Sequence, residues 1–79
     1  MWTEGTIGIP NGDGKYTAVK YWVKHFEEPS DFGIKGGRMS KLTLSINGKI
    51  VCSYERGWDV RPTCDAARAA YKILLKEYN

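Results

Sequence analysis

The first 26 residues alternate between apolar and polar positions and predict a β-hairpin. Residues 2–9 and 15–26 are rich in β-branched and aromatic side chains, the residue types that favour strands. Between them, residues 10–14 read Pro-Asn-Gly-Asp-Gly, a dense signal for a turn. We therefore expect two antiparallel strands joined by this turn.

The cross-strand pairs predict a register for this hairpin. One alignment brings Trp2 opposite Trp22 and Ile9 opposite Lys15. The same alignment brings Glu4 opposite Lys20. An aromatic pair and an opposite-charge pair each contribute about 0.2–1 kcal/mol to such a ladder. Side chains alternate between the two faces of a strand, so any turn with an odd number of residues keeps the same residues on each face.

A second hairpin is predicted for residues 41–46 and 49–54, around Asn47-Gly48, the strongest short-range hairpin signal. A two-residue turn would pair Ile46 with Lys49 and place Leu42 and Leu44 on one face with Val51 and Ser53. A three-residue turn with Gly48 in a left-handed bulge would pair Ser45 with Lys49. It would then place the two leucines on one face with Ile50, Cys52 and Tyr54. We favour the bulged turn, because burial decides the register.

Residues 27–40 break the alternating pattern and predict a long loop. Pro29 and three glycines punctuate this segment. A loop of this length in a small domain is unusual and is often functional. We expect Phe32 and Ile34 to attach it to the body of the protein.

The C-terminal part predicts a turn over residues 55–62 and then an amphipathic helix. Thr63, preceded by Pro62, is the expected N-cap. From Cys64 to about Glu77 the chain contains strong helix formers and no helix breaker. Apolar residues recur at spacings of three and four and form one stripe, which comprises Ala67, Ala70, Tyr71, Leu74 and Tyr78.

Together these elements predict an α+β fold in the order β-β-loop-β-β-α. About four strands, in two hairpins, form one antiparallel sheet packed against a single C-terminal helix. A chain of 79 residues has room for one domain, so residues 1–79 are expected to form a single domain.

Charge and composition narrow the function classes. The net charge is +3, from 12 Lys and Arg against 9 Asp and Glu, which is mildly basic and below that of a dedicated nucleic-acid binder. Two cysteines, Cys52 and Cys64, are too few for a disulfide framework. No apolar stretch is long enough to span a bilayer, and the N-terminal residues lack the pattern of a signal peptide. We expect a cytoplasmic protein with no membrane partner.

Candidate catalytic and metal-binding residues are few. His25, the single histidine, has no spaced motif of acids near it, and a histidine at a strand rim is the favoured interpretation. Cys64, in the predicted first helical turn, could be an activated thiolate, but a small buried cysteine is the commoner state. Two thiols and one histidine fall short of a four-ligand zinc site. We expect no enzyme activity, no metal and no cofactor.

The most suggestive pattern lies on the even-numbered face of the second strand. Lys20, Trp22 and Lys24 alternate there, ahead of Phe26. Bases can stack on such rings while lysines contact phosphates. The alternative is that the long loop covers Trp22 and Phe26 and that the lysines only protect a strand edge. We favour this alternative, because the net charge is small.

Two further places in the chain offer candidate contact residues. Trp58 could pack under the helix start as part of a structural corner, or with Arg56 it could anchor a protein interface. Arg38 follows a glycine pair, but the residues after it do not continue a phosphate-binding motif. The candidate partner or nucleic-acid contacts are therefore Lys20, Trp22, Lys24, Arg38, Arg56 and Trp58.

Three segments of the chain read Glu28-Pro29-Ser30-Asp31-Phe32-Gly33-Ile34, Gly37-Arg38-Met39-Ser40-Lys41-Leu42 and Tyr54-Glu55-Arg56-Gly57-Trp58-Asp59. These segments resemble a family of small uncharacterised proteins of Gram-positive bacteria and their phages and mobile elements. The likeness covers most of the chain and carries no assigned activity. It implies a cytoplasmic accessory protein.

Two functions are consistent with these observations. The first is a small non-enzymatic protein-interaction or accessory module, which could pair with itself through a sheet face or edge. The alternative is a weak, sequence-tolerant nucleic-acid binder that uses Lys20, Trp22 and Lys24.

Overall fold

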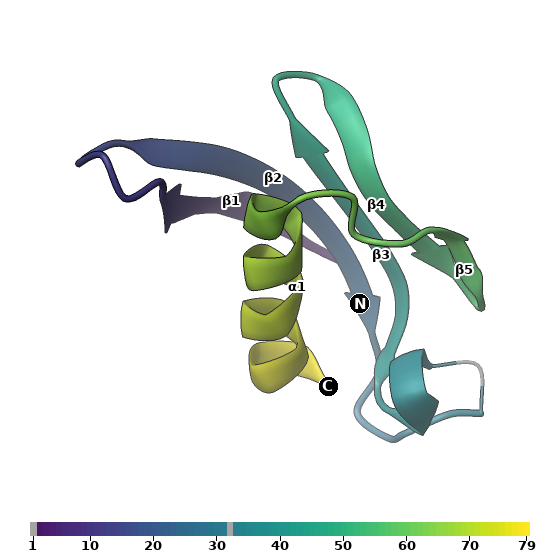
Figure 1. The fold of residues 1–79 in the computed structure, drawn as a ribbon. Coiled ribbons are helices and arrows are strands. Elements are labelled where there is room, and N and C mark those ends of the chain that lie inside the picture. Colours follow the sequence, from purple (N-terminus) through teal and green to yellow (C-terminus); the bar gives the residue numbers. More distant parts are fainter. Residues whose placement is uncertain (1, 32) are drawn as a thin grey trace.

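The structure is a computed structural model that describes residues 2–31 and 33–79. Five strands form one sheet in the order β1-β2-β3-β4-β5, with every neighbouring pair antiparallel. Helix α1 lies across one face of this sheet (Figure 1). The elements are β1 (Trp2–Pro10), β2 (Tyr16–His25), the 3-10 turn η1 (Ile34–Gly36), β3 (Met39–Ile46), β4 (Lys49–Glu55), β5 (Trp58–Val60) and α1 (Asp65–Tyr78).

The α+β class and the single C-terminal helix are confirmed, but the sheet has one strand more than predicted. Strand β5 lies in the segment expected to be only a turn, and Trp58 pairs with Tyr54 on β4. A tight connection makes this pairing feasible. Arg56 adopts a left-handed conformation with φ 58°, and the Glu55 N–H donates to the Gly57 carbonyl over 2.9 Å.

The first hairpin forms, but its predicted register is wrong by two residues. Trp2 lies opposite Lys24, and Glu4 lies opposite Trp22. The turn sets this register, because the Asn11 N–H donates to the Lys15 carbonyl over 2.9 Å and closes a loop of residues 11–15, one residue further along the chain than the predicted loop of residues 10–14. An error of two residues leaves each side chain on its predicted face.

Gly5 accommodates the shifted register. It lies opposite Tyr21, and a Cβ at this position would lie 2.7 Å from the Tyr21 hydroxyl oxygen. Only a residue without a side chain leaves room for this ring. The ring then occupies the helix side of the sheet.

The second hairpin has a two-residue turn, so the predicted bulged turn is wrong. Asn47 and Gly48 both have positive φ, at 52° and 79°, and Ile46 pairs with Lys49. The bulge occurs further along, where the register shifts between Leu44 and Ser45.

Because of this bulge, most residues of β4 still lie on the face that was predicted for them. Leu42 lies opposite Tyr54 and Leu44 lies opposite Cys52, as expected. Ile50 was predicted on the same face, but it pairs with Ser45 before the shift and is 48% exposed. The extra residue of a bulge changes the parity of the strand beyond it.

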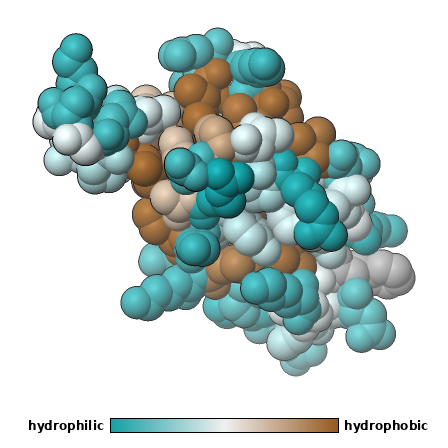
Figure 2. All heavy atoms as spheres, in the orientation of Figure 1, coloured by the Kyte–Doolittle hydropathy of each residue, from teal (hydrophilic) through white to brown (hydrophobic). Residues whose placement is uncertain are grey.

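The hydrophobic core lies between the sheet and α1. Strands β2, β3 and β4 contribute buried residues to it, and Ala67, Ala70 and Leu74 of the predicted helix stripe are buried against them. Alanine side chains let the helix backbone approach the sheet closely. Figure 2, viewed from the helix side, shows hydrophobic side chains gathered around the β3–β4 hairpin and beside the helix, with a hydrophilic tip at the β1–β2 loop.

The predicted N-cap of the helix is also corrected. Cys64 occupies the N-cap position, and its side chain makes no capping hydrogen bond. Thr63 is used elsewhere, because its Oγ1 and its backbone N–H both donate to the Val51 carbonyl. Thr63 therefore ties the helix approach to β4.

The loop over residues 27–40 is fastened on the helix side of the sheet. Ile34 is 1% exposed and belongs to the core cluster. The Asn79 side chain joins the loop to the helix end: its Nδ2 donates to the Ile34 carbonyl, and its Oδ1 accepts from the Met39 N–H, each over 3.0 Å. Ile34 thus fastens the loop as predicted, while Phe32 lies outside the described residues.

We predict that Asn79→Ala lowers the free energy of unfolding by about 1–3 kcal/mol, because it leaves the part-buried Met39 N–H without its acceptor and removes one of the two donors to the Ile34 carbonyl, the other being the Gly37 N–H. Urea unfolding measures this loss. Lys72→Ala, an exposed change on the same helix, is the matched control and should alter stability by less than about 0.5 kcal/mol. Equal stability of the two variants would contradict the role of Asn79.

Candidate binding face of the sheet

The face of the sheet opposite α1 carries the candidate site. Strand residues alternate between faces, so the neighbours of buried Val19, Val23, Leu42 and Leu44 point away from the helix. No second layer of helix or strand covers them among the described residues (Figure 1). We call this surface the open face, and the register arranges it in three rows: Trp2, Lys24, Lys41, Glu55; Glu4, Trp22, Thr43, Ser53; and Thr6, Lys20, Ser45, Ile50.

Lysines and exposed rings interleave at one end of the open face. The Lys24 Nζ lies 6.0 Å from the Trp2 ring centroid and 5.5 Å from that of Phe26. The Lys41 Nζ also lies 6.0 Å from the Trp2 centroid. Trp2 is 58% exposed and Phe26 is 45% exposed. Cation–π contacts at exposed sites contribute about 0.5–1 kcal/mol each, so the lysines help to hold the rings in place.

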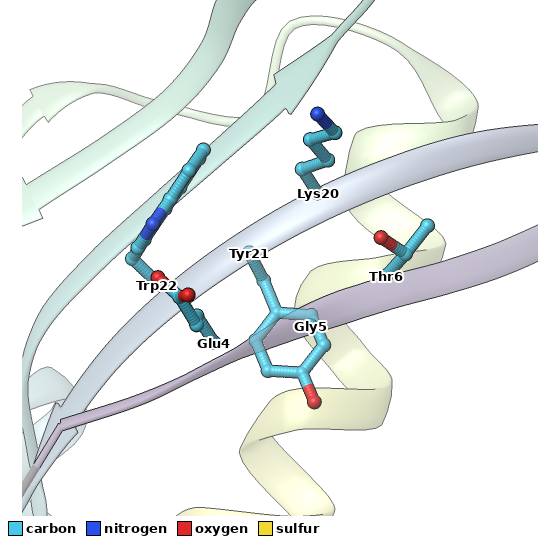
Figure 3. Close-up of a pocket in the computed structure, with 6 residues that line it drawn as sticks. All are labelled: Glu4, Gly5, Thr6, Lys20, Tyr21 and Trp22. Atoms are coloured by element: carbon cyan, nitrogen blue, oxygen red, sulfur yellow. The ribbon is translucent and has the colours of Figure 1, made fainter.

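Two hollows flank Glu4 and Trp22 on this face. One has a volume of about 270 Å³ and is lined by Glu4, Gly5, Thr6, Lys20, Tyr21 and Trp22. Figure 3 shows Lys20 and Thr6 extending to one side of the ribbons and the Tyr21 ring to the other. Glu4 and Trp22 are cross-strand partners. The second hollow, of about 230 Å³, is lined by Trp2, Thr3, Glu4 and Trp22.

The predicted contact residues divide into two groups. Lys20, Trp22 and Lys24 lie together on the open face. Arg38 precedes β3, where its carbonyl accepts from the Phe26 N–H, and Arg56 lies in the turn between β4 and β5.

Trp58 lies on the helix side, away from the open face. Its ring makes edge-to-face contacts with Tyr54 and Tyr71, at centroid distances of 5.1 and 5.4 Å. The Arg61 guanidinium lies 5.3 Å from the same ring. These contacts agree with the interpretation of Trp58 as part of a structural corner rather than as an anchor of a protein interface.

The loop does not cover the open face through Ile34, contrary to the favoured sequence interpretation. Ile34 is buried in the core cluster on the helix side, and Phe26 is exposed. The sequence interpretation also left Trp2, Glu4 and Lys41 out of the site. A correct register would have found them, because it places Trp2 beside Lys24 and Lys41 in one row.

The groups considered for catalysis are engaged in packing on the helix side. The His25 ring lies 4.8 Å from the Tyr78 ring, and its Nε2 lies 3.4 Å from Thr3 Oγ1. Cys52 is buried and Cys64 half-buried, both as free thiols. No group of three or more His, Cys, Asp and Glu that could hold a metal occurs among the described residues.

Residues 1–79 match the model of a family described as a domain of unknown function (DUF7678). The chain belongs to this family. The match confirms the coarser part of the resemblance, since DUF7678 is uncharacterised, and it extends over the first hairpin, which the three matching segments left out. No curated protein and no solved structure matches this DUF7678 chain. In the part of the chain that the structure describes, none of the helices has the length and apolar character needed to cross a membrane.

Removing single indoles will distinguish the two faces. We predict that Trp58→Ala lowers the free energy of unfolding by about 2–3 kcal/mol, somewhat less than for a fully buried ring. Trp2→Ala should cost less than about 1 kcal/mol, because it removes mainly exposed cation–π contacts. Urea unfolding measures both losses. A larger loss for Trp2→Ala than for Trp58→Ala would contradict the assignment of Trp58 to the packed side of the sheet and of Trp2 to the open face.

Burial on the helix side also predicts a pH dependence. Burial raises the pKa of the Cys52 thiol from 9.0 to about 11, and burial is the main cause that raises the pKa of Tyr71 and of Tyr78. Between these two pH values the unfolded chain has lost the Cys52 proton while the folded chain retains it. The free energy of unfolding should therefore fall as pH rises from about 9 to 11, by at most about 1.4 kcal/mol per pH unit for this group.

Cys52→Ala should flatten this alkaline loss, leaving the smaller contribution of the two tyrosines. Urea titrations at intervals from pH 8 to pH 11 measure both slopes. Cys64→Ala is the matched control, because it removes the other, half-buried thiol. Identical slopes for Cys52→Ala and the unchanged protein would show that Cys52 does not ionise in this window.

Proposed function

We propose that this protein is a non-catalytic binding module whose open face binds single-stranded nucleic acid. The observation that carries the proposal is the interleaving of exposed rings and lysines on a sheet face that α1 leaves uncovered. Trp2 and Phe26 are largely exposed, and Lys24 lies over both rings. Stacking of a base on an aromatic ring contributes about 1–3 kcal/mol.

The shape of the face favours a single strand over a duplex. Unpaired bases can lie flat on exposed rings, whereas the bases of a duplex are stacked on each other. Lys20 and Lys24 flank Trp22 at two-residue steps along β2, about 7 Å on either side. A phosphate on each side of a stacked base can therefore meet a lysine.

The charge of the face predicts weak binding. Three lysines lie on it together with Glu4 and Glu55, and Glu55 is paired with Lys41, with 3.0 Å between Nζ and Oε1. Binding that neutralises about three phosphates would give a slope near −2 in a plot of log affinity against log salt concentration. We expect this modest slope.

Fluorescence anisotropy of a labelled short oligothymidine, titrated at several salt concentrations, tests the proposal. Trp22→Ala should weaken binding about tenfold or more through the loss of a stacking ring. Lys20→Ala should reduce the steepness of the salt slope by about 0.7. Lys72→Ala, on the exposed side of α1, is the matched control and should change neither quantity. Absence of binding at low salt would refute the proposal.

A second candidate function is self-association or protein binding through the β1 edge of the sheet. Strand β1 has nine residues with no lysine or arginine, and it lies at the sheet edge. Long edge strands without such protection can pair with another strand. The other edge, β5, has only three residues. Sedimentation velocity at high salt tests this candidate. A dimer formed by strand pairing should persist there, whereas binding of nucleic acid is weak at high salt.

The cellular setting belongs to the same proposal. We place the protein in the cytoplasm as an accessory factor of a mobile element of Gram-positive bacteria. The resemblance of the three segments supports the mobile-element setting. The two free cysteines, Cys52 and Cys64, support the cytoplasm, because cytoplasmic thiols stay reduced. Thiol labelling of protein that is taken directly from cells and unfolded tests the cytoplasmic part of this setting: both cysteines should react, and a disulfide between them would contradict it.

A further inference from the structure

Glu4 is a carboxylate in the middle row of the open face, on the edge strand β1, and the face otherwise suits an anionic ligand. Glu4 lines both hollows beside Trp22, and it lies directly opposite Trp22 on the neighbouring strand β2. Glu55 on the same face is paired with Lys41. Neither the Lys41–Glu55 ion pair nor the Arg68–Asp65 ion pair uses Glu4. A carboxylate in this position repels phosphates, so it needs another role.

We propose that Glu4 recognises guanine in the hollow between Trp2 and Trp22; this inference rests on the proposed binding of single-stranded nucleic acid. The base stacks on an indole and turns its Watson–Crick edge toward Glu4. Its N1–H and one N–H of its 2-amino group donate to the two carboxylate oxygens. Paired hydrogen bonds to a charged acceptor are the strong kind and have a defined geometry.

Guanine is the one common base whose Watson–Crick edge has two adjacent donors. Adenine and cytosine each offer an amino donor beside a ring nitrogen that is an acceptor, and this acceptor would face a carboxylate oxygen. Thymine and uracil offer one N–H between two carbonyl oxygens, which would repel the carboxylate. One such contact makes the protein prefer guanine at a single nucleotide, and the other nucleotides of the strand can have any base.

The surrounding residues suit a base in this hollow. Trp2 and Trp22 line it together with Glu4 and Thr3, and rings on two neighbouring strands offer stacking surfaces at its sides. Lys24 lies opposite Trp2 in the same row, on the adjoining strand β2, and contacts its ring. Its ammonium group is placed to meet the phosphate of the nucleotide whose base stacks there.

Modified bases at the centre of an oligothymidine test the inference on the unaltered protein. A central guanine should increase affinity about tenfold over thymine, since hydrogen bonds to a charged group are worth this much or more. Inosine, which lacks the 2-amino group, should lose most of the gain. The 7-deaza analogue of guanine keeps its Watson–Crick edge and should retain the gain. Adenine, which stacks equally well, should show none.

Two variants then assign the preference to a side chain. Glu4→Ala should abolish the gain from guanine, and it should tighten binding of plain oligothymidine slightly, because it removes a carboxylate that repels phosphates. Glu55→Ala removes the other carboxylate of the open face and should keep the guanine preference. Both positions are exposed, so neither change should disturb the fold, and thermal unfolding checks this.

The outcomes separate this inference from the proposed function. Equal affinities for guanine and inosine, or a guanine preference that persists in Glu4→Ala, would overturn the role of Glu4 while oligothymidine binding still supported the proposed function. Failure of every oligonucleotide to bind at low salt would overturn both.

Discussion

A single helix can cover only one face of a sheet, and this limit shapes the rest of the molecule. Helix α1 has 14 residues, or about 21 Å of length, and five strands span about 19 Å between the outer two. The helix and the loop that Asn79 attaches to it therefore cover one face of the sheet only. The core forms where Ala67, Ala70 and Leu74 meet the strands, and the opposite face is left to water or to a partner.

The alternation of side chains makes the fold predictable even where the register is not. In the first hairpin the predicted pairing is wrong by two residues, and an even error leaves each face intact. In the second hairpin an incorrect turn and an unforeseen bulge nearly cancel, so that Cys52 and Tyr54 keep their predicted face while Lys49 and Ile50, which precede the bulge, change face. Local pattern thus predicts which side of a strand is buried, but not which residue lies opposite which.

This distinction explains how much of the candidate site the sequence could reveal. Lys20, Trp22 and Lys24 lie on one strand, so their common face follows from alternation alone. Trp2 and Lys41 join them only through the registers of two separate strand pairs. Those registers depend on hydrogen bonds within the 11–15 loop and on a shift near Lys24, which no hydrophobic pattern encodes. Strand β5 was missed because three residues are too few to show a period.

The three indoles have different surroundings, so their intrinsic fluorescence reports on different parts of the molecule. Trp2 is mostly exposed to solvent, and Trp22 borders the hollows of the open face. Trp58, in contrast, lies between two tyrosine rings. A soluble quencher such as iodide should reach the first before the last, and a stacked base should dim the emission of the open face alone. Emission from Trp58 then serves as an internal standard for the integrity of the fold.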